Sequence, residues 1–183
     1  MAALATWTRE DGLLGALAPL GLAASVPTCL VVDLDPDGPR YPGSATLAGL
    51  VGDGPRRDDL APSRRGLAVL ANGGVTADEA RPVLEALVAG WPAVVVRLPA
   101  SFDLRRRPCP VVPVRPLFPG ALLPPGRGPA VYQHAGWNLP LPGPGVALPR
   151  PSPAVWAALA AGSRPPADRW IRAWRVVWRL PWR

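Results

Sequence analysis

Short, mostly apolar segments alternate along the first hundred residues with segments that have the composition of helices. The segments CLVVDL at 29–34, GLAVLA at 66–71 and AVVVRL at 93–98 contain runs of Val and Leu, and such runs are typical of strands that a parallel sheet buries on both faces. In chain order, we expect a strand at 2–7, a helix at 13–24, a strand at 29–34, a short helix at 44–51, a strand at 66–71, a helix at 76–89 and a strand at 93–98. Thr76 and Glu79 have the spacing of a capping box, which marks the start of the helix at 76–89. This order predicts an α/β fold with a small parallel sheet and helices on both faces.

Proline limits what the rest of the chain can form. Of the 76 residues from Pro108 onward, 17 are proline, which excludes long helices and central strands over most of this half. We expect an edge strand within 109–120, a short strand at 130–137, extended polyproline-like chain at 139–153 and a short helix at 153–161. The extended chain is either a stiff connector or a docking segment for an aromatic groove. We therefore predict an α/β domain at 1–120, a Pro/Gly-rich extension with short elements at 121–167, and an amphipathic helix at 168–183.

Residues 12–32 are uncharged and, by length, sufficient to cross a bilayer. Pro19, Pro27 and three glycines interrupt this segment, and the preceding Arg9-Glu10-Asp11 is not the positive region of a signal peptide. We expect the segment to divide at Pro27 into a buried helix and a buried strand. A membrane span remains the alternative.

Charge separates the two halves of the chain. Residues 1–104 carry 8 Arg and 12 acidic residues, net −4, whereas residues 105–183 carry 12 Arg and one acidic residue, net +11. The second half therefore favours a phosphate, an anionic lipid surface or an acidic partner. All 20 basic residues are arginine, which excludes Schiff-base chemistry, a phosphate-loop lysine and a lysine general base.

The thiols and the imidazole are few and far apart. Cys29 and Cys109 are the only cysteines and His134 is the only histidine, so zinc would need ligands from remote parts of the chain instead of closely spaced pairs. Two cysteines without a disulfide framework fit a reducing cytoplasm. We expect no metal site and no cofactor.

Four segments, CLVVDLDPDGP, ATLAGLVG, RRGLAVLANGG and WPAVVVRLP, follow one another within residues 1–100. At this spacing they resemble three strands of the MinD/ParA/CpaE group of deviant P-loop ATPases. Asp33-Leu34-Asp35-Pro36 is the most specific part of the match. The resemblance implies a Rossmann-like, P-loop-type sheet.

The chain departs from that family where the family binds ATP. A Gly-rich loop with a lysine is expected after the first strand, because its amides and its ammonium group hold the phosphates. The corresponding residues 5–14 contain one glycine, no lysine, and the carboxylates of Glu10 and Asp11. Arg97 stands where the family has its magnesium-associated aspartate. ATP hydrolysis is not expected, because both charge-stabilising elements are absent.

Asp33 and Asp35 leave a different chemistry open. As residues i and i+2 they share one side of an extended strand, which suits acid/base or metal work at a strand end. They are remnant candidates for ligand binding, or simply exposed carboxylates at the end of a strand. No G-x-S-x-G motif accompanies them, so the sequence predicts no catalytic residue.

The most distinctive segment is DRWIRAWRVVWRLPWR at 168–183. Asp168 is a natural N-cap, Pro181 should end the helix near Leu180, and aromatic and cationic residues separate onto two faces. The candidate membrane- or partner-binding residues are Arg169, Trp170, Arg172, Trp174, Arg175, Trp178, Arg179, Trp182 and Arg183. This helix would lie on an anionic membrane, fill a groove in a partner, or pack its tryptophans onto its own domain. A C-terminal amphipathic targeting helix is also what the MinD resemblance implies.

These observations predict a non-catalytic scaffold or localisation factor derived from such an ATPase. It would act in the cytoplasm, at the inner face of the cell membrane or on a protein partner, in division, envelope or pilus-assembly machinery. The alternative is a small α/β enzyme or ligand-binding domain that uses Asp33 and Asp35 at the strand ends. A homodimer stays open, and a nucleic-acid partner is not expected, because the first half is acidic and no DNA-binding motif occurs.

Overall fold

The structure is a computed structural model that describes residues 2–9, 12–120, 128–136 and 139–182. Its elements are β1 (Ala2–Trp7), α1 (Gly12–Ala24), β2 (Thr28–Asp33), α2 (Leu47–Asp53), β3 (Gly66–Leu70), α3 (Arg81–Gly90), β4 (Ala93–Arg97), the 3-10 turn η1 (Leu104–Arg106), β5 (Val111–Leu117), β6 (Ala130–His134), β7 (Gly145–Leu148), α4 (Pro153–Ala160) and α5 (Arg169–Val177). Within the described residues, seven strands form one sheet in the order β3-β2-β4-β1-β5-β6-β7, and every pairing is parallel. The expected α/β fold class is confirmed.

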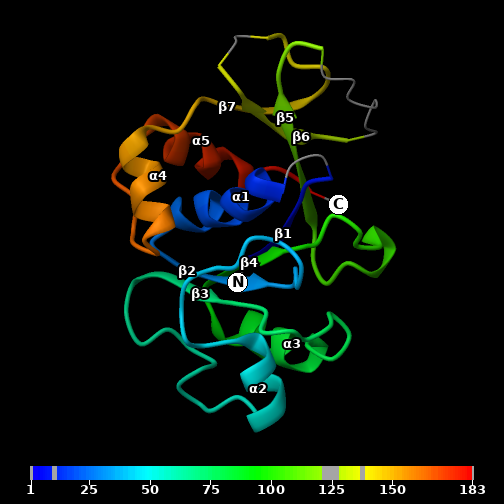
Figure 1. Ribbon diagram of the computed structural model, residues 1–183, viewed down its shortest axis with the longest axis vertical. Coiled ribbons are helices and arrows are strands. Elements are labelled where there is room, and N and C mark those ends of the chain that lie inside the picture. Colours follow the sequence, from blue (N-terminus) through cyan, green and yellow to red (C-terminus); the bar gives the residue numbers. More distant parts are fainter. Residues whose placement is uncertain (1, 10–11, 121–127, 137–138, 183) are drawn as a thin grey trace.

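Two layers of helices bury the sheet. Helices α1, α4 and α5 lie on one face, and α2 and α3 lie on the other (Figure 1). The centre of the sheet has valine on both faces: Val31 and Val95 point into the core below α1, and Val32 and Val96 point into the core below α3. The unbroken aliphatic runs of β2 and β4 therefore follow from burial on both sides.

The apolar segment at 12–32 divides as expected into α1 and β2, with a turn at Pro27. Helix α1 is apolar on nearly all sides because the sheet lies below it and α5 packs on it from above. Among the residues that the structure describes, no helix combines the length and the apolar character needed to cross a membrane.

Helix α3 begins at Arg81, five residues later than the capping-box spacing predicts. The capping box does form: the Thr76 amide and hydroxyl donate to the Glu79 carboxylate at 2.9 and 2.6 Å. It closes a separate turn, however, and Pro82 lies in the first turn of the helix, where its missing N–H is tolerated. Pro82, which falls inside the helix expected at 76–89, therefore marks the beginning of the helix.

Strand β5 lies inside the sheet and not at its edge. It pairs with β1 over residues 111–113 and with β6 over residues 114–117. Because the two pairings are staggered, each half of β5 has only one hydrogen-bonded neighbour, so Pro113 and Pro116 are accommodated as they would be in an edge strand.

The sheet also continues beyond residue 120, where the expected α/β domain ended. β6 and β7 extend it within the segment expected to be a Pro/Gly-rich extension, and β7 replaces part of the polyproline-like chain expected at 139–153. Helix α5 joins the same core as α1. The described parts of the first two predicted segments therefore share one sheet, and α5 of the third segment packs into the same core as α1.

Candidate functional site

Asp33 and Arg97 end two neighbouring strands at the carboxyl edge of the sheet. β2 and β4 are parallel, and their register places Asp33 directly beside Arg97. Asp35 follows two residues after the end of β2. Ligands of open α/β sheets bind at this edge, so Asp33 and Asp35 lie where a ligand of such a sheet would bind.

Arg97 binds both carboxylates. Its Nη1 donates to Asp33 Oδ2 at 3.3 Å and its Nη2 donates to Asp35 Oδ2 at 2.6 Å. Nη1 also donates to the carbonyl of Pro39 at 2.7 Å, and the guanidinium lies 5.3 Å from the ring centroid of Tyr41. The Arg97 side chain is 1% exposed and Asp33 is 2% exposed. The two carboxylates therefore form a buried ion-pair network with Arg97, in which a short, charge-assisted bond joins Arg97 to Asp35.

The chain after β2 is folded around this network. Asp33 Oδ1 accepts from the amide of Asp35 at 3.0 Å, and Asp35 Oδ1 accepts from the amides of Asp37 and Gly38. A Cβ at Gly38 would lie closer than 3.0 Å to Arg97 Nη2 and to the Asp35 carboxylate. Gly38 is therefore required by the close approach of the backbone to the ion pair.

Burial raises the pKa of Asp33 to about 6, although the Arg97 charge and the Asp35 amide act in the opposite direction. Burial also raises the pKa of Tyr41, whose hydroxyl donates to the carbonyl of Ala16 in α1 at 2.7 Å. Arg97 forms its shorter bond with Asp35, and the Asp33 carboxyl, with a pKa of about 6, changes charge near pH 6.

The Asp33→Asn variant should remove a component of the pH dependence of stability. The Asp33 carboxyl has a pKa of about 6 in the folded protein and an ordinary value of 3.8, so it binds its proton more tightly in the folded state. The stabilisation of the folded state that results is complete below about pH 4 and is lost as the pH rises through 6. We expect the free energy of unfolding of the wild type to fall by about 2–3 kcal/mol relative to Asp33→Asn between about pH 4 and pH 7. Urea unfolding of both proteins across this range measures the difference. A difference that does not change with pH would show that Asp33 titrates like an exposed carboxyl.

A cavity of about 350 Å³ lies beside the network and is open to the same edge. Asp33, Asp35, Arg40, Thr46 and Asn72 contribute its polar lining. Two of these residues use their side chains to stabilise the local fold. The Asn72 amide group donates to the carbonyls of Asp33 and Val75, and its oxygen accepts from the amides of Gly74 and Val75. The Thr46 hydroxyl caps α2. Among the described residues, no group of three or more His, Cys, Asp or Glu could hold a metal ion.

The segment between β1 and α1 is where the family resemblance would place a phosphate loop. The Thr8 side chain in this segment is buried. Its methyl group lies so close to Gly15 of α1 that a Cβ added at Gly15 would be 3.0 Å from it. Trp7 Nε1 donates to the carbonyl of Ala100 at 3.2 Å. Glu10 and Asp11, the two carboxylates noted in the sequence, lie outside the described residues. Thr8 therefore packs against α1, and Trp7, at the end of β1, is hydrogen-bonded to the chain that follows β4.

The tryptophans of the C-terminal segment lie against α1. Trp170, Trp174 and Trp182 are buried and Trp178 is half-buried. Trp170 and Trp174 pack edge to face, with ring centroids 5.7 Å apart. Trp178 Nε1 donates to the carbonyl of Leu22 and to the Ser25 hydroxyl, so of the three arrangements considered for this helix, the structure has the tryptophans packed on their own domain.

The arginines of α5 point away from the core. Arg169, Arg172 and Arg175 of α5, and Arg179 two residues after its end, are exposed, and none of them has an ion pair within the part of the chain that the structure describes. Arg183 lies outside the described residues. The helix begins after Asp168, whose carboxylate accepts from the Trp170 amide at 2.7 Å, and ends at Val177, before the position expected from Pro181.

Sequence reasoning found Asp33 and Asp35 but not their partner. Arg97 stood out only as a departure from the family pattern. The signal that was present is that Asp33 and Arg97 each interrupt an aliphatic run near its carboxyl end, and parallel strands bring such positions to one edge. The cavities, which depend on how loops pack, left no signal in the sequence.

Comparison with protein-family models, with curated proteins and with solved structures finds no match to this chain.

Proposed function

We propose that this protein is a non-catalytic scaffold or localisation factor, related to MinD/ParA/CpaE-type ATPases, that presents an arginine face to an anionic membrane surface. The observation that carries the first part is the position of the Arg97 guanidinium. It lies at the carboxyl edge of the sheet, where a nucleotide-bound metal would need free carboxylates, and it pairs with both Asp33 and Asp35. A site whose carboxylates already have an internal cation is poorly suited to bind a second one.

The alternative, an enzyme or ligand-binding domain that uses Asp33 and Asp35, has weaker support. The cavity of about 350 Å³ beside them is large enough for a small ligand. Yet general acid/base work needs a carboxyl that reaches a substrate, and both carboxylates here are held by Arg97 and by backbone amides.

The α5 face supports the second part of the proposal. Its tryptophans fix the helix to α1, so the exposed arginines form a rigid row on the outside of the molecule. Each arginine near an anionic bilayer contributes about 1 kcal/mol. Because the indoles are in the core, we expect attachment to be peripheral and electrostatic, without insertion of the helix into the acyl region. The site of action would be the inner face of the cell membrane, in division, envelope or pilus-assembly machinery.

Vesicle flotation of the full chain tests this proposal. We expect flotation with vesicles that contain phosphatidylglycerol, no flotation with phosphatidylcholine alone, and loss of binding at about 0.5 M salt, where exposed charges are screened. The Arg172→Glu/Arg175→Glu variant should stay unbound, because it reverses the charge at two exposed positions of the row.

Arg56→Glu/Arg57→Glu, which changes two exposed arginines outside α5, is the matched control and should float like the wild type. Binding that is equal for both vesicle types, or that both double variants lose equally, would contradict the proposal. If the full chain binds no vesicle, the membrane proposal is wrong.

A further inference from the structure

Strand β3 is an edge strand of the described sheet, and along most of its length its outer side has no neighbouring strand among the residues that the structure describes. It pairs with β2 on one side, and on the other side the described chain forms one isolated bridge, from Thr46 to Ala71 just beyond the end of β3. Natural proteins usually cover or charge such edges, because unpaired amides and carbonyls are a template for another strand. Here the strand itself, GLAVL, has no charged residue.

The contacts of Ala71 show which backbone groups face outward. Its carbonyl accepts from the Leu47 amide, on the outer side, at 2.7 Å. In an extended strand, alternate residues direct their N–H and C=O groups to the same side. Val69 and Leu67 therefore present their amides and carbonyls to the open edge, beyond the stretch that Thr46 and α2 cover.

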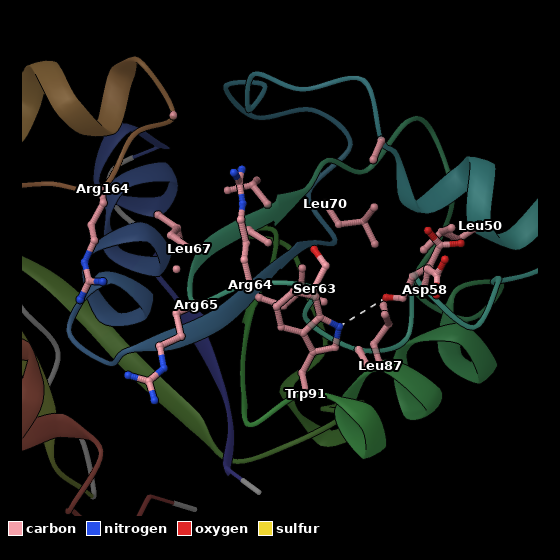
Figure 2. A pocket seen from close by; sticks show the side chains of 18 of the residues that line it. Leu50, Asp58, Ser63, Arg64, Arg65, Leu67, Leu70, Leu87, Trp91 and Arg164 are labelled. Carbon is pink, nitrogen blue, oxygen red and sulfur yellow. Dashed lines mark hydrogen bonds between the residues drawn. The ribbon is translucent and has the colours of Figure 1, made fainter.

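A groove of about 570 Å³ runs along this edge, and Figure 2 shows its lining. Residues 66–70 of β3 form one side, and the chain at 58–65 together with Leu87 and Trp91 contributes to the rest. Trp91 Nε1 donates to the carbonyl of Asp59 at 3.4 Å, which ties this loop to the end of α3. Leu67 and Val69 are only half-buried, and within the described part of the chain no loop or turn donates to or accepts from their backbone groups. The groove therefore offers apolar side chains as well as backbone donors and acceptors.

The charges of the groove are divided between its two sides. Arg64, Arg65 and Arg164 lie on one side and Asp58 lies on the opposite side (Figure 2). Asp59 also lines the groove, and its carboxylate accepts from the Arg56 amide at 2.8 Å. Within the described residues, none of these three arginines has an ion pair. Because Arg64 and Arg65 directly precede β3, the cationic side coincides with the beginning of the strand.

We propose that this edge is a docking groove for an extended segment of a partner protein, which adds as a strand beside β3 with its acidic residues next to Arg64, Arg65 and Arg164. Strand addition obtains affinity from main-chain hydrogen bonds and selectivity from alternate side chains. Both elements are present, in the outward amides and carbonyls of Leu67 and Val69 and in the half-buried aliphatic floor. The arginines select an acidic segment over a basic one. This groove does not involve the arginine row of α5, so the inference does not depend on membrane attachment.

A titration with short peptides, followed by NMR of the ¹⁵N-labelled full chain, tests the inference. The probes are acetylated peptides of about eight residues in which valine, isoleucine or tyrosine alternates with glutamate, a pattern that favours an extended strand. The controls are the same peptides with arginine in place of glutamate, and the glutamate peptides with alternate amides N-methylated. We expect the glutamate peptides to shift the Leu67 and Val69 amide signals and to slow their hydrogen exchange, and we expect neither control to do so.

Variants separate backbone pairing from charge. Arg64→Glu/Arg65→Glu should weaken binding of the acidic peptides at least about fivefold, since two favourable contacts become repulsive. Val69→Pro removes one edge N–H and should weaken binding about tenfold relative to Val69→Ala, and an unchanged HSQC pattern elsewhere shows that the sheet is intact. Arg172→Glu/Arg175→Glu should change the affinity less than twofold, which separates this groove from the α5 face.

Three results would overturn the inference. The first is the absence of binding by every glutamate peptide. The second is binding that N-methylation leaves unchanged, because strand addition requires those amides. The third is a concentration-dependent dimer in which the Leu67 and Val69 amides are already protected, because the occupant of the edge would then be a second copy of this chain.

Discussion

Replacing Arg97 with methionine lowers the free energy of unfolding by about 3–5 kcal/mol, the cost typical of removing one partner from a buried ion pair. The variant leaves the Asp33 and Asp35 carboxylates next to each other without the cation that both contact. It also leaves the Pro39 carbonyl without its donor. Chemical denaturation at pH 7 measures the loss, and we expect it to shrink at about pH 5, where Asp33 can be protonated.

Two further variants test whether the lost charge of Arg97 causes the loss of stability. In Asp33→Asn/Asp35→Asn/Arg97→Met no buried charge is left uncompensated, so it should recover a large part of the lost stability. Arg65→Met, at an exposed position, is the matched control and should change the free energy of unfolding by less than about 0.5 kcal/mol. A loss that is equal at both pH values and is not recovered in the triple variant would show that Arg97 acts through packing of its side chain alone.

Replacing Trp174 with alanine lowers the free energy of unfolding by about 3–5 kcal/mol, the range for large aromatic side chains in a core. The Trp174 side chain is 0% exposed, packs edge to face on Trp170 and, like Trp170, lies close to Gly21 of α1. Val176 lies in the same helix at 47% exposure, so Val176→Ala is the matched control and should cost less than about 1 kcal/mol. Urea unfolding followed by circular dichroism measures both.

The same contact can be tested from α1. A Cβ at Gly21 would lie less than 3.0 Å from atoms of both Trp170 and Trp174. Gly21→Ala should therefore destabilise the protein by about 1–3 kcal/mol through overpacking, although alanine favours a helix. If Trp174→Ala and Val176→Ala have equal, small effects, α5 is not fixed to α1 and its tryptophans are free to bind a surface.

The core strands could be predicted because their composition, which is almost entirely aliphatic, indicates that they are buried. β2, β3 and β4 are aliphatic runs that a sheet covers on both faces, and the structure places each within a residue or two of its expected bounds. The beginning of α3 could not be located as well, since Thr76 and Glu79 form a capping box on a turn that precedes the helix. β7 was missed because Gly145 and the prolines on either side of the strand, Pro144 and Pro149, have the composition of extended chain. Its pairing with β6 supplies hydrogen bonds that the local sequence does not reveal.

The candidate site could be predicted in its acidic half only. Asp33 and Asp35 end an aliphatic run and were visible, whereas their pairing with Arg97 spans 62 to 64 residues and depends on the register of β2 against β4. The Trp and Arg faces of the last segment were visible from helical spacing. Which of the two faces meets the domain was not, since an amphipathic helix presents the same pattern to a core, a partner and a membrane.

The packing of α5 on α1 has a consequence for how the chain folds during its synthesis. Trp178 binds the carbonyl of Leu22, a residue 156 positions earlier. At about 5–20 residues per second on the ribosome, the apolar surface of α1 stays uncovered for roughly 8–30 s before the tryptophans that close it are made. During that interval the nascent chain carries most of its sheet but lacks one side of its core, so chaperone binding to α1, or slow translation before residue 170, would decide how much of the protein reaches the native state.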